Sequence, residues 1–476
     1  MSHEVSAART FSAADQLAFA RLSGDYNPIH VDACAARRTQ AGAPVVHGVH
    51  GALWALEKIV AAEPAFSQAA SLKIQFPKFM YLDSGVEVRL ARRTEQAIKV
   101  ELTSVGVVTT IIDVKFGARP ATPPWDGPDA QGWTLGDAPL APAFPHMADG
   151  AGWIPLSDGS NAAAMFPALS QALGTARVEA LARLSTLVGM ICPGLHSIFS
   201  SLAVDFVDED ASPRGIRWQT VRTDDRFRLV TMKVLGCGIA GQVQAFMRAE
   251  PVEPPSIAAL SGIVAKDEFS QRKALVIGGS RGLGAVTAKL LAAGGAQVYL
   301  TYATGRDDAD AIAEEICAGR GEAAASTLRC NVLGDFDAQL AELPPTLTHL
   351  YYFATPRIAH QATQPYTKER FDAFAAVYVD GFARLLRWAL VHTTEKPHAI
   401  LYPSTAFIEE RPKGMAEYAM AKAAGEILAA ELASTTGISI SAPRIPRVLT
   451  DQTATVLPLQ TEDPVAVILP LLRAEP

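Results

Sequence analysis

Residues 273–302 constrain the fold of this 476-residue chain more than any other stretch. They read "KALVIGGSRGLGAVTAKLLAAGGAQVYLTY", which is an apolar run, a glycine-rich turn, a helix-length segment and a second apolar run. This order predicts a βαβ unit, in which two parallel strands are joined through a helix. We therefore expect an α/β domain in the last part of the chain, with helices on both faces of a parallel sheet.

Three glycines of this turn, Gly278, Gly282 and Gly284, have the spacing G-x-x-x-G-x-G between the strand and the helix. Glycine lets the backbone approach a pyrophosphate closely, and a helix N-terminus favours the negative charge of that group. The turn therefore predicts a dinucleotide site. Its expected members are Gly278, Ser280, Arg281, Gly282, Leu283 and Gly284.

A second motif lies further along the same part of the chain. In "EYAMAKAAGEILAAEL", Tyr418 and Lys422 are four residues apart and share one helix face. Before them, "AILYPSTAF" reads as a strand that ends in Ser404 and Thr405. With the glycine pattern, residues 270–455 resemble the short-chain dehydrogenase/reductase family.

This resemblance implies that Tyr418 donates a proton to the substrate carbonyl oxygen and that Lys422 lowers the tyrosine pKa and holds the nicotinamide ribose. A hydroxyl from Ser404 or Thr405 would orient the carbonyl. Family spacing favours Thr405, whereas Ser404 is the chemically more usual choice, and both are retained as candidates. Tyr378 stands where the family has a relay asparagine. The cofactor contacts expected outside the glycine turn are Tyr302, Asn331, Val332, Ala354, Tyr418, Lys422 and Thr450.

The end of the second strand bears on the choice of cofactor. An acid there binds a ribose 2′-hydroxyl and selects NAD. Here the sequence reads "LTYATGR", with no acid beside the strand end, while Arg281 and Arg306 lie near it in the sequence. Two cations suit a 2′-phosphate, so we expect NADP(H) as the cofactor.

The N-terminal part carries a different motif. Residues 24–32 read "GDYNPIHVD", and His47-Gly48 follows at the head of an apolar segment. This pattern resembles the MaoC-like hydratase/dehydratase family, which has the hot-dog fold, over about the first 115 residues. The resemblance makes Asp25 and His30 the catalytic pair. Asn27 and the backbone N–H groups near Gly48 are the expected substrate or oxyanion contacts.

An acid and a base on one side of a 2-enoyl thioester suit the addition of water, because one proton leaves the water and another reaches the α-carbon. We expect His30 to act on the water or the 3-hydroxyl and Asp25 on the α-proton, with the exchanged assignment left open. His47 and His50 are expected to support the helix start, and Asp32 to be structural.

The N-terminal part also shows an internal repeat. "VHGVHGALWAL" (46–56) and "CPGLHSIFSSL" (192–202) align Gly48 with Gly194 and His50 with His196, and strand-like text follows each. We expect each copy to head a helix that antiparallel strands wrap. The spacing of 23 residues from Asp25 to Gly48 leads back from Gly194 to Gln171, so we expect the second copy to be non-catalytic.

The expected fold class is multidomain, an α+β double hot-dog followed by an α/β Rossmann doubly wound parallel sheet. The expected segments are a catalytic hot-dog (1–118), a Pro/Gly-rich linker (119–150), a second hot-dog (151–255), a linker (256–269) and the reductase domain (270–476).

Composition excludes several partners. A net charge of -7 and a pI near 5.8 do not suit nucleic acid, and no apolar run approaches the ~18 residues of a membrane helix. The N-terminal "MSHEVSAARTF" lacks the apolar core of a signal peptide, so we do not expect one there. The five cysteines form no C-x-x-C pair, so we expect neither a disulfide framework nor a metal site. We expect a cytoplasmic protein. A homodimer is one of its expected partners.

Together the motifs predict a bifunctional enzyme of fatty acid or polyketide metabolism. It would reduce a 3-oxoacyl thioester with NADPH and dehydrate the 3-hydroxyacyl product, or hydrate the 2-enoyl thioester, carried on coenzyme A or on acyl carrier protein. One alternative is a degradative enoyl-CoA hydratase and NAD-dependent 3-hydroxyacyl-CoA dehydrogenase. Another is a binding scaffold for acyl carriers with a degenerate reductase.

Overall fold

The computed structural model of the protein describes residues 5–61, 63–128, 132, 138–208, 214–321, 324–358, 366–451, 453 and 460–475. The chain forms two compact units, one that runs to Glu250 and one that starts at Pro251. We call them the hot-dog unit and the Rossmann unit, for the topologies described below.

The hot-dog unit is built on one antiparallel sheet of ten strands in the order β1-β3-β4-β5-β2-β7-β10-β9-β8-β6. The strands are β1 (Val5–Thr10), β2 (Ala69–Gln75), β3 (Gly85–Arg93), β4 (Ala97–Ser104), β5 (Val107–Phe116), β6 (Ala151–Pro155), β7 (Ser197–Phe206), β8 (Gly215–Asp224), β9 (Leu229–Gly236) and β10 (Ile239–Met247). Read from its outer edge, the second half repeats the order of the first. The halves join where β2 pairs with β7, with Ser71 opposite Asp205.

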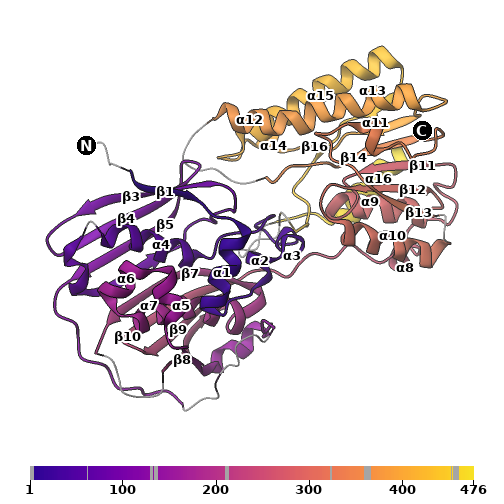
Figure 1. Cartoon of the computed structure of the whole chain (residues 1–476). Helices are drawn as coiled ribbons and strands as arrows, with labels where there is room; N and C mark the ends of the chain where they lie inside the picture. Colours follow the sequence, from indigo (N-terminus) through magenta and orange to yellow (C-terminus); the bar gives the residue numbers. More distant parts are fainter. Residues whose placement is uncertain are drawn as a thin grey trace. The chain divides into compact units, whose positions relative to one another are not determined.

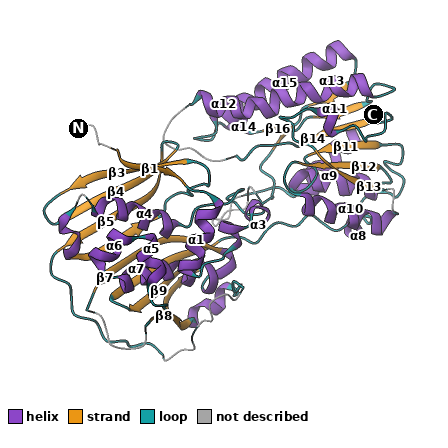
Figure 2. Ribbon diagram, viewed as in Figure 1, coloured by secondary structure: helices purple, strands orange, loops and turns teal. Residues whose placement is uncertain are grey.

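Two long helices carry the apolar faces that this sheet covers. α4 (Gly48–Val60) lies between β1 and β2 in the chain, and α7 (Thr175–Thr186) lies between β6 and β7. They pack on each other and on the same side of the sheet (Figures 1 and 2). Strand β4 alternates buried residues such as Val100 and Leu102 with more exposed ones, as a strand with one face on a core does. The double hot-dog expected from the sequence is confirmed.

Shorter helices fill the space between each first strand and its central helix. In the first half they are α1 (Ala13–Ser23), α2 (Pro28–Val31) and α3 (Ala33–Arg37), and η1 (Pro64–Gln68) follows α4. In the second half they are α5 (Ser160–Met165) and α6 (Pro167–Leu173). η2 (Phe144–Asp149) precedes β6, and η3 (Leu187–Ile191) and η4 (Gly194–His196) follow α7. η3 is one turn of π-helix that continues α7.

The sequence alignment of the two repeats, which matched Gly48 with Gly194 and His50 with His196, is wrong. Gly194 and His196 form a single 3-10 turn that leads into strand β7, whereas Gly48 opens helix α4. By position in the topology, the start of α7 at Thr175 is the counterpart of Gly48. The correspondence of Asp25 with Gln171 was counted back from Gly194, so it is wrong as well. The described residues between β6 and α7 still contain no acid followed five positions later by histidine.

The Rossmann unit contains a six-stranded parallel sheet in the order β13-β12-β11-β14-β15-β17. Its strands are β11 (Lys273–Ile277), β12 (Gln297–Tyr302), β13 (Ala325–Arg329), β14 (His349–Tyr352), β15 (Ala399–Leu401) and β17 (Ser439–Ser441). Numbered along the chain, this is the 3-2-1-4-5-6 order of a dinucleotide-binding fold. Beside it, β16 (Ser404–Thr405) pairs with β18 (Arg444–Ile445).

Both faces of this sheet are covered, as a parallel sheet requires. Ala274 and Val276 of β11 belong to one apolar core, while Leu275 and Ile277 belong to the other. The first core is completed by α8 (Ile257–Leu260), α9 (Gly282–Ala293), α10 (Arg306–Arg320) and α16 (Pro464–Ala474). On the other side lie α11 (Phe336–Gln339), α12 (Lys368–Ala375), the π-turn η5 (Ala376–Gly381), α13 (Phe382–His392), α14 (Phe407–Glu410) and α15 (Ala416–Thr436).

Residues 129–131 and 133–137 of the expected linker lie outside the described residues. Its described end acts as a strap, because the backbone of Leu140 donates to Met190 O and accepts from Leu195 N. Among the described helices, none has both the length and the apolar character needed to cross a lipid bilayer.

Candidate active sites

The turn after helix α1 places the first candidate pair. Gly24, in the left-handed region at φ 79°, ends α1, and Ser23 Oγ accepts the N–H of Asp25. Asp25 Oδ1 accepts the N–H of Asn27 at 3.0 Å, and Asn27 in turn caps α2 by accepting the N–H of Ile29. Pro28 occupies the first position of α2, where its missing N–H has no cost. These nested turns hold Asp25 and His30 in a fixed relation.

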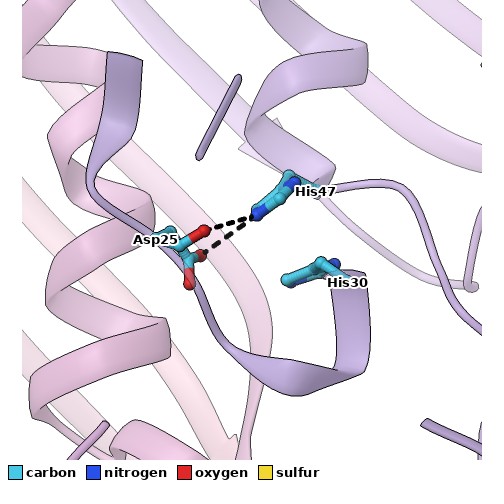
Figure 3. A group of neighbouring side chains, drawn as sticks. All are labelled: Asp25, His30 and His47. Atoms are coloured by element: carbon cyan, nitrogen blue, oxygen red, sulfur yellow. Dashed lines mark hydrogen bonds and ion pairs between the residues drawn. The ribbon is translucent and has the colours of Figure 1, made fainter. Parts of the chain in front are cut away.

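Three side chains meet at this turn (Figure 3). The ligating atoms of Asp25, His30 and His47 all lie within 4.8 Å of one another. His30 Nδ1 donates to Val45 O at 2.8 Å, which leaves its Nε2 as the unprotonated nitrogen of the neutral ring. His47 Nε2 lies 3.0 Å from the backbone oxygen of Asp25 and 3.9 Å from its Oδ2. The site therefore pairs a carboxyl group with an imidazole that has one open nitrogen.

Burial shifts these groups away from their ordinary titration. It raises the pKa of Asp25, and the hydrogen bonds from Ser185 and Asn27 and the nearby His30 only partly oppose this. Burial lowers the pKa of His30, with partial compensation from Asp25. It also lowers the pKa of His47, and the neighbouring His30 adds to that effect. The neutral carboxylic acid and the neutral imidazole are thus favoured together.

The same three residues also form a possible metal-binding group, but their ring geometry argues against one ion. The rings of His30 and His47 are stacked with centroids 3.8 Å apart and planes inclined by 23°. Imidazole lone pairs lie in the ring plane, so nearly parallel rings direct them side by side. A shared ion cannot lie in both planes at a Zn–N bond length of about 2.1 Å.

The predicted oxyanion contact lies at the first turn of α4, with His47 as the N-cap. The first N–H groups of a helix have no intrahelical acceptor and can bind an anion. Gly48 is required here because an added Cβ would lie 2.8 Å from the ring of Phe76. His47 is held by its own contacts, since its backbone N–H and Nδ1 both bond Gln16 Oε1. His50 stacks on Phe19 behind the site.

The second half of the hot-dog unit contributes residues that sequence reasoning missed. Ser185 on α7 donates its hydroxyl to Asp25 Oδ2 at 2.6 Å. Asn27 Nδ2 donates to Gly189 O and Gly194 O, at 2.7 and 3.1 Å. The separation of about 160 residues between donor and acceptor leaves no local sequence signal for either contact.

In the Rossmann unit, the glycine turn has the backbone that a dinucleotide requires. Gly278 and Gly282 adopt φ 77° and 54°, which other residues rarely do. An added Cβ on Gly284 would lie 2.2 Å from Gly278 O, so only glycine lets α9 start this close to the strand. Ser280 and Arg281 complete the turn, and Arg281 is the N-cap of α9. The first described N–H groups of α9 therefore face the crevice at the strand ends.

The other expected cofactor contacts follow neighbouring strands of the same sheet. Tyr302 ends β12, Asn331 and Val332 come just after β13, and Ala354 comes just after β14. The carboxyl ends of parallel strands meet at one edge, which brings these residues to the glycine turn. Thr450 also comes close, because an added Cβ on Gly282 would lie 3.8 Å from its methyl group.

Tyr418 and Lys422 lie on one face of α15, both buried. Lys422 Nζ donates to Pro403 O at 2.6 Å and lies 4.0 Å from the ring centroid of Tyr378. Burial lowers the pKa of Lys422 to about 7. Tyr378, in the π-turn η5, shares a hydrogen bond of 2.6 Å between its hydroxyl and that of Thr355. An aromatic ring thus occupies the place predicted for the relay position.

The two candidate hydroxyls before α15 point to different partners. Ser404 Oγ donates to Glu426 Oε1 at 2.5 Å, within an ion pair that Glu426 makes with Arg444. Thr405 Oγ1 instead accepts the N–H of Phe407 at 3.2 Å. Burial raises the pKa of Tyr418, and the neighbouring hydroxyl of Thr405 partly opposes that rise. The structure brings Thr405, and not Ser404, to the predicted proton donor.

Comparison with known proteins bears on both sites. The family model described as "MaoC like domain" matches residues 1–115, and the model described as "short chain dehydrogenase" matches residues 272–457. The chain joins an N-terminal MaoC-like domain to a C-terminal short-chain dehydrogenase domain. Both family resemblances are thereby confirmed.

Solved structures similar to the chain include a short chain dehydrogenase from Burkholderia cenocepacia in complex with NADP. It is 25% identical, with coverage of 44% of this chain and 92% of that chain and a TM-score of 0.39. The angucycline C-6 ketoreductase LanV with bound NADP is 26% identical over 37% of this chain and 72% of its own, with a TM-score of 0.33. The search of curated proteins gave no match.

The MaoC-like match ends at residue 115, so the second hot-dog repeat lies beyond it. Asp25, His30, Asn27 and Gly48 all belong to the MaoC-like domain. The glycine turn, Tyr418 and Lys422 all belong to the short-chain dehydrogenase domain. Each candidate site is therefore contained in one domain, apart from the contacts that the second repeat adds to Asp25.

Proposed function

We propose that the chain is a bifunctional acyl-thioester enzyme of the cytoplasm. Its MaoC-like domain interconverts an (R)-3-hydroxyacyl thioester and a 2-enoyl thioester, and its short-chain dehydrogenase domain reduces a 3-oxoacyl thioester with NADPH. The observation that carries the first activity is the arrangement of buried Asp25 and half-buried His30, with the open Nε2 of His30 beside the carboxyl group. The acyl carrier is coenzyme A or acyl carrier protein.

Hydration needs a base for water and an acid for the α-carbon. His30 Nε2 takes a proton from water as the water oxygen bonds to C3, and the C2–C3 π electrons move toward the thioester carbonyl. Asp25 then gives its proton to C2, which restores the carbonyl. The shifts of both pKa values favour this starting state, a neutral acid beside a neutral imidazole. Dehydration runs the same proton transfers in reverse from the carboxylate and the imidazolium.

Charge that develops on the thioester oxygen needs donors that are already in place. The N–H groups in the first turn of α4 are positioned as such donors, at the helix end whose dipole favours negative charge. The packing of Phe76 on Gly48 fixes the approach to this turn. We therefore assign thioester orientation to the start of α4 and proton transfer to Asp25 and His30.

In the short-chain dehydrogenase domain, the residues fit a dinucleotide. The contact of Gly284 with Gly278 and the two positive-φ glycines leave room for a pyrophosphate that any side chain would remove. A bound nicotinamide cofactor supplies the hydride. Tyr418 donates the proton to the carbonyl oxygen, and Thr405 orients that oxygen beside it. Lys422 lies one helix turn after Tyr418 on the same face of α15, and we assign the cofactor ribose to its Nζ.

NADP(H) is favoured over NAD(H) by charge. The described residues that follow β12 up to Arg306 include no acid to bind a ribose 2′-hydroxyl. Arg281 lies at the N-cap of α9, inside the glycine turn. Arg306 is the weaker candidate, because it lies outside the glycine turn, at the start of α10. We therefore assign recognition of the 2′-phosphate mainly to Arg281.

The two activities share an intermediate, since the reduced product is the substrate of dehydration. Linkage in one chain raises its local concentration at the second site. The test is direct: the purified chain is supplied separately with a 2-enoyl thioester in water and with a 3-oxobutyryl thioester plus NADPH. The proposal expects hydration in the first reaction and NADPH oxidation in the second. Loss of either activity on both coenzyme A and acyl carrier protein substrates would remove that half of the proposal.

A further inference from the structure

We infer that the second hot-dog repeat positions the candidate acid of the first repeat. Ser185 is the positioning residue that holds the carboxyl group of Asp25. This inference rests on the proposed hydratase activity of the Asp25–His30 pair. The second repeat has, in its described residues, no acid–histidine pair of its own between β6 and α7. Its central helix nevertheless ends directly against the catalytic turn of the first repeat.

The contact is short and excluded from water. Ser185 Oγ donates to Asp25 Oδ2 at 2.6 Å, and both residues are buried, with exposed fractions of 4% and 2%. The other carboxyl oxygen, Oδ1, accepts the backbone N–H of Asn27 at 3.0 Å. Each oxygen thus has its own donor, one from each repeat. Together the two donors fix the rotation of the carboxyl group about its Cβ–Cγ bond.

The π-turn η3, which continues α7, lies against the carboxyl group of Asp25. Gly189 lies in this turn, and an added Cβ there would be 2.4 Å from Asp25 Oδ1. A π-turn leaves carbonyl groups free of helical hydrogen bonds, and such turns are frequent at functional sites. Here Gly189 O accepts from Asn27 Nδ2, and Met190 O accepts from Leu140 N of the strap. The turn therefore holds the catalytic loop on one side and the strap on the other.

Two further residues of α7 secure the same loop. Arg183 Nη1 donates to Ser23 O at 3.0 Å, and the hydroxyl of Thr186 donates to the same oxygen. Ser23 in turn accepts the N–H of Asp25 through its side chain. Arg183, Ser185 and Thr186 thus form three adjacent contacts from one helix to the residues around Asp25. A helix that served only as core would not direct three polar side chains to one turn.

The hydrogen bond from Ser185 matters because it favours the ionised carboxylate in a buried place. The charged or titratable groups around Asp25 are His30 on α2, His47 at the N-cap of α4 and Arg183 on α7. The residues of η3 add only apolar side chains or none. Loss of the Ser185 hydroxyl removes the only donor to Oδ2 from the second repeat among the described residues, so proton release from Asp25 becomes harder.

The experiment measures 2-enoyl thioester hydration by the full chain across pH for wild type, Ser185→Ala, Ser185→Thr and Ser170→Ala. Ser185→Ala should lower kcat by ~10-fold with little change in KM, because the acid is misplaced while the thioester contacts remain. The alkaline limb of kcat/KM, where the acid–base pair loses its last proton, should move up by about 1 pH unit. Ser185→Thr keeps the hydroxyl and should recover the wild-type profile.

Ser170→Ala is the matched control. Ser170 is a buried serine of the same repeat whose hydroxyl donates to Ala162 O, away from Asp25, and its removal should leave the pH profile in place. Gly189→Ala is the independent variant. Its methyl group must displace the carboxyl group, so it should lower kcat although alanine is the better helix former. A wild-type profile for both Ser185→Ala and Gly189→Ala would overturn the inference.

A second readout separates this inference from the proposed function. Carbon-13 NMR of protein labelled at aspartate Cγ, assigned with Asp25→Asn, follows the titration of Asp25 without any substrate. The pKa should be higher in Ser185→Ala than in wild type or Ser170→Ala. An inactive wild type with this shift would remove the hydratase proposal and keep the positioning role, whereas an unshifted Asp25 would remove the positioning role. If Ser185→Ala does not fold, the pH profile of hydration and the NMR titration of Asp25 are compared for Ser185→Thr and Gly189→Ala. These two variants then test the positioning role.

Discussion

The ring of His47 stacks on the ring of His30 with centroids 3.8 Å apart. This contact, with the bond from His30 Nδ1 to Val45 O, fixes the direction of the open Nε2 atom. His47 is also the N-cap of α4, the helix that we propose to donate to the thioester oxygen. The stacked pair therefore joins this helix to His30, the proposed base. The orientation of the base and the orientation of the thioester therefore depend on the same residue.

The first prediction concerns the acid–base pair. Asp25→Asn and His30→Ala should each lower hydration of a 2-enoyl thioester by at least ~100-fold, the usual contribution of a positioned acid or base. Carbonyl reduction by the same variants should be unchanged. Asp32→Asn is the control, because Asp32 only caps α3 through the N–H groups of Cys34 and Ala35, and asparagine caps equally well. Normal hydration by both site variants would contradict the assignment.

The second prediction separates the two hydroxyls before α15. Thr405→Val should lower reduction of a 3-oxoacyl thioester by ~100-fold, because the group that orients the carbonyl beside Tyr418 is lost at constant volume. Ser404→Ala should have a much smaller effect, since the Ser404 hydroxyl bonds Glu426. Steady-state NADPH oxidation measures both. A larger loss in Ser404→Ala would assign the orientation of the carbonyl to Ser404 and contradict this prediction.

The third prediction concerns cofactor choice. The wild type should bind NADPH more tightly than NADH, and Arg281→Ala should narrow the difference by ~10-fold, the usual contribution of a charge-assisted contact. Arg306→Ala should change it little, because Arg306 pairs with Asp310. Fluorescence titration of the two reduced cofactors gives the ratio. A wild type that prefers NADH would favour the degradative alternative.

The fourth prediction is a dependence of stability on pH. Burial lowers the pKa of His50 from 6.5 to about 3, with a further decrease from nearby Arg9. A folded-state pKa below the unfolded value means that the unfolded chain binds more protons, so stability is full above pH 6.5 and falls as the pH decreases toward 3. Between pH 7 and 5 this group removes roughly 2 kcal/mol from the free energy of unfolding.

Urea unfolding at the two pH values measures this difference. His50→Phe, which keeps the aromatic ring next to Phe19, should lose roughly 2 kcal/mol less than the wild type between pH 7 and 5. His146→Gln, at an exposed histidine of the same unit, should behave as the wild type does. An equal pH dependence in His50→Phe would show that His50 does not titrate as a buried neutral group.

The sequence predicted the placement of those candidate residues that depend on local spacing. Asp25 and His30 are five residues apart, and one short turn places both, so a motif could name them. Tyr418 and Lys422 are one helix turn apart and were predictable for the same reason. The glycine turn could also be predicted from the sequence. The positive φ of Gly278 and the close contact of Gly284 with Gly278 both require glycine.

Contacts between distant segments were not accessible in this way. Ser185 reaches Asp25 only because α7 packs beside the first repeat, and nothing near Ser185 in the chain indicates an acid as its partner. The alignment of Gly48 with Gly194 failed because it compared residue identities across a helix and a turn before a strand. The order of strands and helices, which repeats without sequence identity, was the dependable signal.

The structure also changes one expectation about the relay position. The family has an asparagine where Tyr378 stands, so the family resemblance alone suggests that Tyr378→Asn should leave the reduction rate unchanged or raise it. The structure shows Tyr378 fully buried beneath Lys422 and bonded to Thr355. Asparagine would leave a cavity there, so Tyr378→Phe, which keeps the ring under Lys422, is the variant that isolates the hydroxyl.

The most direct test of the two-site account follows one 3-oxobutyryl thioester through both reactions with NADPH, by mass spectrometry. Wild type should give the 3-hydroxyacyl and the 2-enoyl thioesters together. Asp25→Asn should stop at the 3-hydroxyacyl product, while Tyr418→Phe should oxidise no NADPH yet still hydrate an added 2-enoyl thioester. Formation of the 2-enoyl thioester by Asp25→Asn, or NADPH-dependent reduction by Tyr418→Phe, would contradict the account.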